Sequence, residues 1–177
     1  MRSQDYHIFI KPFITFEIVT LVNQILVKNN LSIKADKHSS IRLYDYEIGE
    51  DEFYFTTEDI VNPKLDLDKI KNNPSGGSIS YQYFNSEVLI SFNIIDCELY
   101  SIDTISISFH FQIYELYQEL IDNLIKVIHN KTNAIRTIGG ENISDDVDTA
   151  KNELKNAKKG IFEQRYVIDW QSSHKKK

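Results

Sequence analysis

Cysteine is nearly absent from the sequence, which has a single one, Cys97. One cysteine excludes a disulfide within the chain, and this fits a reducing cytoplasm better than an oxidising compartment. Proline and glycine are also scarce, at 3 and 6 residues, whereas tyrosine and phenylalanine number 10 each. This balance favours packed strands and helices over long loops.

The sequence also lacks a long uninterrupted apolar run. The most apolar segment, residues 13–27, is interrupted by Glu17, Asn23 and Gln24. It is shorter than the about 20 apolar residues that a membrane-spanning helix needs, and no small-residue cleavage site follows it. We therefore expect no membrane span and no signal peptide, and we predict a cytoplasmic protein.

Positive charge is in deficit, because 20 Lys and Arg residues face 26 Asp and Glu residues, for a net charge of −6. This argues against a nucleic-acid binder, which needs a basic surface to displace counterions. A protein with a basic surface is the natural partner. The length of 177 residues predicts one domain over residues 1–170, followed by a polar, Lys-rich tail at 171–177 that we expect to be disordered.

Motifs for metal or cofactor chemistry are missing. His7, His38, His110, His129 and Cys97 are scattered along the chain rather than clustered as metal ligands would be. No phosphate-binding loop or nucleophile motif occurs. We predict no metal and no cofactor. One alternative remains: a small enzyme whose site is assembled from dispersed residues, with His110 and nearby carboxylates as candidates.

Hydrophobic periodicity and turn signals predict an α+β fold. Four helices are expected, at Thr15–Asn29 with Thr15 as its cap, Pro63–Asn72, Tyr114–Lys131 and 144–159, the last one mostly exposed. Alternating, β-branched or aromatic runs predict strands at 6–11, 31–35, 41–48, 52–57, 78–84, 87–95, 104–112 and 161–170. Short turns between them favour antiparallel pairing. The prediction is a mostly antiparallel sheet of about six strands packed against two long helices, with a further C-terminal helix.

The predicted core joins the longest helix to the best-patterned strand. Leu120, Leu124 and Ile128 recur at helical spacing, and Phe109 and Phe111 lie on the apolar side of the alternating segment 104–112. The stretch Thr132–Asn142 contains adjacent glycines and is predicted to be a mobile loop.

The segment from Tyr44 to Asp59 differs from the rest of the chain. No Lys or Arg lies between Arg42 and Lys64, and aromatic residues alternate with carboxylates. Because acidic residues are poor strand formers, a strand that keeps them usually presents them to a partner. The predicted partner-binding residues are Tyr44, Asp45, Tyr46, Glu47, Glu50, Asp51, Glu52, Phe53, Tyr54, Glu58 and Asp59. An alternative is an edge hairpin whose charges block aggregation.

The run LYDYEIGEDEFYFTTED, from Leu43 to Asp59, resembles the bacterial immunity proteins that neutralise a cognate toxin. It resembles them in character rather than in a shared motif, so no family residues are carried over. The resemblance implies tight, stoichiometric binding to a toxin domain with a basic cleft. A third possibility is an adaptor subunit of a larger assembly. The sequence does not specify an oligomeric state.

Overall fold

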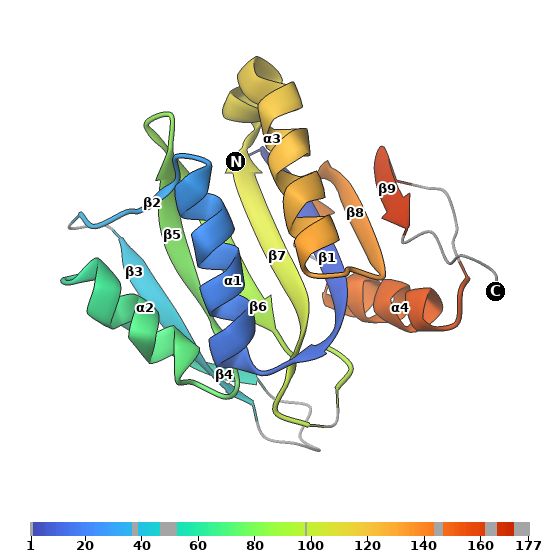
Figure 1. Ribbon diagram of the computed structural model, residues 1–177, viewed down its shortest axis with the longest axis horizontal. Helices are drawn as coiled ribbons and strands as arrows, with labels where there is room; N and C mark the ends of the chain where they lie inside the picture. Colours follow the sequence, from blue (N-terminus) through green and yellow to red (C-terminus); the bar gives the residue numbers. More distant parts are fainter. Residues whose placement is uncertain are drawn as a thin grey trace.

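An antiparallel sheet forms the framework of the chain (Figure 1). The computed structural model describes residues 2–36, 39–46, 53–97, 99–143, 147–161 and 166–171. Within them the sheet has nine strands, which are β1 (Ser3–Phe13), β2 (Ser32–Ile33), β3 (Ser40–Tyr46), β4 (Phe53–Asp59), β5 (Gly77–Tyr83), β6 (Ser86–Asn93), β7 (Ile102–His110), β8 (Arg136–Glu141) and β9 (Ile168–Gln171). The antiparallel α+β prediction is therefore confirmed, although the sheet has more strands than the six expected.

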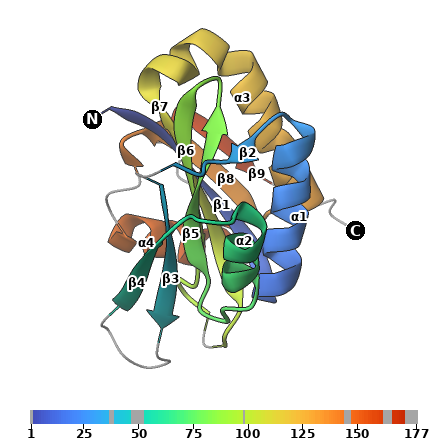
Figure 2. The same cartoon turned by 90° about the vertical axis from the view of Figure 1, so that its left-hand side faces the viewer.

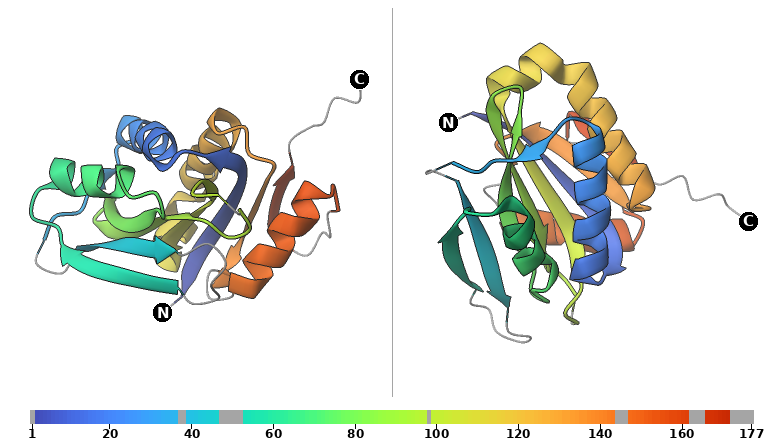
Figure 3. Two further views of the ribbon diagram at one scale, coloured as in Figure 1. Left: turned by 90° about the horizontal axis from the view of Figure 1, so that it is seen from below. Right: turned by 60° about the vertical axis from the view of Figure 1, so that its left-hand side comes forward.

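The strand order is β4-β3-β5-β6-β7-β1-β8-β9. The short strand β2 pairs with one end of β5, at Tyr81 and Gln82, while β3 pairs with the other end. Seen from below, β4 and β9 lie at opposite sides of the molecule (Figure 3). The two outermost strands are therefore far apart and do not contribute to a common surface.

Four helices accompany the sheet in the described part of the chain: α1 (Thr15–Lys28), α2 (Pro63–Lys71), α3 (Phe111–Lys131) and α4 (Val147–Lys158). Helices α1, α2 and α3 cover one face, and α4 lies on the other (Figure 2). We call these the helix face and the open face. The main core lies on the helix face, where Ile90, Ile107 and Tyr6 of adjacent strands meet Val22 of α1 and Leu124 of α3.

The start of α1 differs from its prediction. Thr15 does not cap the helix; Ile14 occupies the cap position, and the Thr15 hydroxyl instead donates to the carbonyl of Pro74 at 3.1 Å. Strand β1 also continues past Pro12 to Phe13, which pairs with Ile102 after an irregularity in the ladder. A register shift of this kind in the ladder tolerates a residue without an N–H.

Helix α2 and the β5–β6 hairpin follow the sequence signals. Asn62 caps α2 by accepting from the Leu65 N–H at 3.3 Å, one residue before Pro63. The hairpin was expected to turn at Asn85 and Ser86, and it turns one residue earlier, at Phe84 and Asn85, whose φ angles are +46° and +59°. Asparagine adopts this left-handed region readily, whereas phenylalanine does so rarely.

The core prediction was partly wrong. Phe109, Leu124 and Ile128 are buried, but Leu120 is 53% exposed. Phe111 is not on β7, because the strand ends at His110 and Phe111 begins α3. Phe111 continues the every-second-residue alternation of the strand although it begins the helix. Periodicity alone therefore did not locate the junction between β7 and α3.

The stretch predicted as a mobile loop contains strand β8, which pairs with both β1 and β9. Gly139 is needed there for space rather than for a turn: a Cβ atom on it would lie 2.9 Å from the Tyr6 ring. Helix α4 is also less exposed than predicted, since Ala150, Glu153, Leu154 and Ala157 are buried. It packs on β1 beside Phe9 and Ile138. Ser144, where this helix was expected to begin, and the tail from Ser172 lie outside the described residues; Gln171 ends β9.

Candidate functional site

The described residues of the segment singled out in the sequence belong to β3 and β4 (residues 40–46 and 53–59), which we together call the edge hairpin. Its pairing runs from Ser40 opposite Asp59 to Tyr46 opposite Phe53. Strand β3 also pairs with β5, whereas no described strand pairs with β4 on its other side. The edge hairpin therefore ends the sheet.

Strand alternation divides the aromatic residues of the edge hairpin between the two faces. Tyr44, Tyr46 and Phe55 share the open face, and Tyr54 lies on the helix face. Tyr54 is 53% exposed and Phe55 is 49% exposed, while Tyr44 and Tyr46 are half-buried. The Arg42 guanidinium lies 5.1 Å from the centre of the Phe55 ring. Both faces of β4 therefore present large aromatic surfaces.

The described carboxylates of the edge hairpin have different roles. Glu58 accepts from Lys69 of α2 at 2.6 Å, and this hydrogen bond raises the pKa of Lys69. Lys69 also contacts Asp66, so Glu58 is tied to α2. Asp45 and Asp59 are exposed, and neither forms a salt bridge within the described residues. Glu47, Glu50, Asp51 and Glu52 lie outside the described residues, and Phe53 begins β4.

Next to the edge hairpin, the open face carries a row of hydroxyl groups that sequence reasoning missed. The register places Arg42, Ser78, Ser91, Ser106 and His7 side by side across β3, β5, β6, β7 and β1. Ser78 and His7 are buried, whereas Ser91 and Ser106 are half-buried. The signal was present in the serines that alternate with isoleucine in β5 and β7, such as Ser78 and Ser106.

His7 and Ser106 form the most chemically organised group in this row. The His7 Nδ1 lies 2.9 Å from the Ser106 Oγ, and the Asn93 amide donates to the same oxygen at 3.1 Å. The His7 Nε2 lies 3.3 Å from the Ile143 carbonyl, which can only accept, so Nε2 carries the proton. Burial lowers the pKa of His7, which favours the neutral ring.

A serine that donates to a neutral imidazole resembles an activated nucleophile. Here the Asn93 amide occupies a lone pair of the oxygen that would attack, and His7 itself is 5% exposed. These hydrogen bonds therefore satisfy the ring nitrogens of a buried imidazole.

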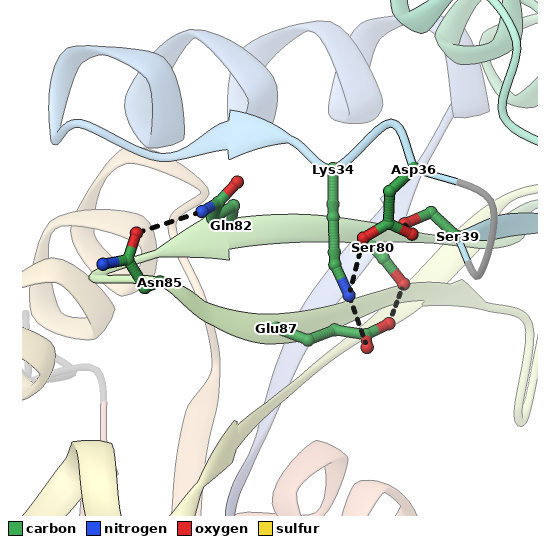
Figure 4. A network of polar contacts seen from close by, with 7 residues as sticks. All are labelled: Lys34, Asp36, Ser39, Ser80, Gln82, Asn85 and Glu87. Carbon is green, nitrogen blue, oxygen red and sulfur yellow. Dashed lines mark hydrogen bonds and ion pairs between the residues drawn. The ribbon is translucent and has the colours of Figure 1, made fainter.

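A second polar network lies on the open face near β2 (Figure 4). The Lys34 ammonium lies 3.3 Å from Glu87 and 3.4 Å from Asp36. Ser80 donates to Glu87, and Ser39 donates to Asp36 at 2.8 Å. These contacts hold Lys34 and Asp36, which follow β2, to Glu87 of β6 and to Ser39, the residue before β3.

The histidine proposed for the alternative enzyme is not joined to a carboxylate in the described part of the chain. His110 is the half-buried last residue of β7, and its side chain forms no hydrogen bond or ion pair with a described residue. An open groove between the end of α1, the β5–β6 turn and α3 is lined by Asn30, Phe84, Leu120 and Val127 among others, and its described lining has neither histidine nor carboxylate. Within the described ranges, no three His, Cys, Asp or Glu side chains gather as a metal site requires.

Helix length and polarity bear on the membrane question. In the part of the chain that the structure describes, no helix is both long and apolar enough to cross a bilayer.

Comparisons with known proteins give little further guidance. No protein-family model matches the sequence, and no curated protein matches it. Among solved structures, the chain is similar to the Pseudomonas aeruginosa T6SS protein PA0821, with 10% identity and a TM-score of 0.45. The match covers 89% of this chain and 46% of that one, so the chain spans less than half of the length of that protein. A likeness at this level assigns neither a family nor an activity.

Proposed function

We propose that this chain is an immunity-type protein that binds and neutralises a toxin domain with a basic surface, and that the edge hairpin is its binding surface. One observation carries the proposal. Tyr54 and Phe55 are each about half exposed on opposite faces of the outermost strand, between the exposed carboxylates Asp45 and Asp59. Large aromatic side chains beside charge are typical anchors of protein interfaces.

Charge along the segment from Tyr44 to Asp59 supports a basic partner. The sequence has seven carboxylates from Asp45 to Asp59, against a net charge of −6 for the whole chain, and no Lys or Arg between Arg42 and Lys64. Of the three described carboxylates, Glu58 is paired with Lys69, whereas Asp45 and Asp59 are exposed. Such a field accelerates encounter with a cationic surface, while the aromatic side chains supply the area that is buried on contact.

Edge protection is the competing explanation for these residues. Charges on an edge strand suffice to discourage pairing with another sheet. Exposed aromatic side chains work in the opposite direction, because they increase the apolar surface that a second edge would bury. The exposure of Tyr54 and Phe55 therefore favours binding over protection.

The test measures association with the partner. Proteins captured by the immobilised chain from lysate of its source cells provide candidates, and each is then produced pure for kinetic measurement. A hairpin variant with Glu50→Lys, Asp51→Lys and Glu52→Lys should associate at least tenfold more slowly at low salt and lose most of its salt dependence. Truncating Tyr54 to alanine should instead mainly raise the dissociation rate.

A matched control separates local charge from net charge. The control carries the same three-carboxylate reversal on the exposed surfaces of α1 and α3, at Glu17→Lys, Glu115→Lys and Glu119→Lys. It should associate at a rate close to that of the parent. Parental association by the folded triple-lysine variant, or equal slowing by the control, would show that the acidic segment from Tyr44 to Asp59 does not recognise the partner.

A further inference from the structure

The backbone of β4 presents hydrogen-bonding groups on its outer side. Two backbone hydrogen bonds nearby determine which residues of β4 supply these groups. The Ile60 N–H donates to the Ser39 carbonyl at 3.1 Å, and the Tyr44 N–H donates to the Gly76 carbonyl at 3.3 Å. In an antiparallel ladder, successive residues direct their N–H and C=O groups to alternate sides. The backbone N–H and C=O groups of even-numbered residues of β3 therefore point toward β5, and those of odd-numbered residues point toward β4.

The same rule assigns the groups of β4. Thr56 and Glu58, opposite Leu43 and Ile41, direct their N–H and C=O groups toward β3. Thr57 and Asp59 direct theirs away from β3, toward a side on which no described strand lies. Both residues are exposed. An outer edge of this kind is a template for one more strand.

We infer that β4 receives an extended segment of the partner, rich in lysine or arginine, which joins the sheet as an additional strand. This deepens the proposed function, on which it rests, by stating how the partner is held. Main-chain hydrogen bonds would supply affinity, and side chains on alternate positions would supply selectivity. Asp59 on the open face places a carboxylate beside the added strand.

Charge decides between a cationic segment and a second copy of this chain. Pairing β4 with another β4 would bring the Glu58 and Asp59 carboxylates of each copy to the shared edge, and like charges across a strand pair are destabilising. A cationic segment meets the same surface with attraction. On the helix face Glu58 is already paired with Lys69, so the attraction is strongest on the open face.

Hydrogen exchange distinguishes strand addition from contact through side chains alone. The probe is a synthetic ten-residue peptide of alternating lysine and threonine with blocked ends. At saturating peptide and low salt, the amides of Thr57 and Asp59 should exchange at least tenfold more slowly, whereas those of Thr56 and Glu58, already bonded to β3, should change little. An alternating glutamate and threonine peptide should give no protection.

The outcomes separate this inference from the proposed function. Peptide binding that requires Glu50, Asp51 and Glu52 but leaves the Thr57 and Asp59 amides unprotected would overturn strand addition. The proposed binding surface would not be affected by that result. Absence of peptide binding would also overturn strand addition, and the partner kinetics described above would still judge the surface. Peptide binding that survives charge reversal would count against both. Protection of these amides in the chain alone, lost on dilution, would assign the edge to a second copy.

Substitution at one position gives an independent check. Thr57→Pro removes an outward N–H and should weaken peptide binding at least tenfold. Thr57→Val keeps that N–H and should bind like the parent. Thr56→Pro should instead lower the melting temperature, because it removes a bond to β3. Equal weakening by Thr57→Val and Thr57→Pro would show that the side chain, and not the backbone, makes the contact, and the inference would fail.

Discussion

The two ends of the sheet use charged residues in opposite ways. At the β8–β9 end, Arg136 is fully buried between Glu153 of α4, at 2.5 Å, and Asp169 of β9, at 2.8 Å. At the β4 end, Asp45 and Asp59 are exposed. Buried charges fix which elements pack together, because an unpaired partner is costly, whereas exposed charges act at a distance. The ion pairs of Arg136 thus join β8 to α4 and β9 at one end, whereas Asp45 and Asp59 stay exposed at the other.

The largest expected effect comes from breaking the buried ion pairs of Arg136. Replacing Arg136 with methionine leaves the buried carboxylates of Glu153 and Asp169 without their cation, and should lower the free energy of unfolding by about 3 to 5 kcal/mol. Chemical denaturation measures this loss. Arg2→Met is the control, because its ion pair with Glu141 is exposed, and its loss should be much smaller. Equal losses in both variants would show that burial of Arg136 is not what matters.

Helix α3 supplies a comparison within one element. Leu124 is 2% exposed and Leu120 is 53% exposed, although they lie one turn apart. Leu124→Ala should cost about 2 to 5 kcal/mol in unfolding free energy, as expected for a buried leucine. Leu120→Ala should stay within about 0.5 kcal/mol of the parent. A thermal melt compares them, and a Leu124→Ala variant that melts with the parent would place the core elsewhere.

Strand β8 provides a third test, at Gly139. A Cβ atom there would meet the Tyr6 ring at 2.9 Å and Ile168 at 3.1 Å. The Tyr6 hydroxyl donates to Asp122 at 2.8 Å, so the ring cannot move without straining that bond. Gly139→Ala should therefore cost about 1 to 3 kcal/mol. Gly140→Ala, which meets only a methyl group of Ile143 at 3.1 Å, should cost less in the same denaturation experiment.

These residues also show how far sequence reasoning reaches. The α2 boundaries and the β5–β6 hairpin could be predicted because Asn62, Pro63 and Asn85 act locally, through a cap, a fixed φ and a left-handed turn. Strand β8 could not, since adjacent glycines normally signal a turn, and only the facing Tyr6 ring explains Gly139. The requirement is set by a residue more than a hundred positions away.

The candidate site was predictable in part for the same reason. Acidic and aromatic residues from Tyr44 to Asp59 stand out in the sequence, and alternation predicts that the aromatic side chains divide between two faces. That β4 is the outermost strand depends on the order of the whole sheet. The ion pair of Arg136 depends on Glu153 and Asp169, which lie in two later elements, so no local pattern marks it.

The pH dependence of stability tests the burial of His7, which lies on β1 between the two ends of the sheet. Burial lowers the pKa of His7 below its ordinary value of 6.5, and burial also lowers that of His129. Well above pH 6.5 these two histidines are neutral in both the folded and the unfolded chain, so they do not make the unfolding free energy depend on pH. Below it the unfolded chain takes up protons that the folded chain resists, so unfolding free energy falls, by up to about 1.4 kcal/mol per pH unit for each histidine.

Single substitutions assign the slope. His7→Asn and His129→Asn should each flatten the dependence of unfolding free energy on pH between 6.5 and 5, measured by denaturation at several pH values. A slope that stays at the parental value in both variants would show that other groups titrate in this window.

The smallest expected effect lies on the edge hairpin. Tyr54 is half exposed on β4, and threonine is a good strand residue, so Tyr54→Thr should change unfolding free energy by no more than about 0.5 kcal/mol. The same substitution at Tyr81, which is 1% exposed and donates to Asn23 at 2.7 Å, should cost several times more. Thermal melts of the two variants compare them directly. A large loss at Tyr54 would mean that this side chain supports the fold, and weaker partner binding by its variants could then reflect unfolding. A negligible loss would show that the stability of the fold does not depend on this ring, so that weaker partner binding by Tyr54 variants would report on a contact.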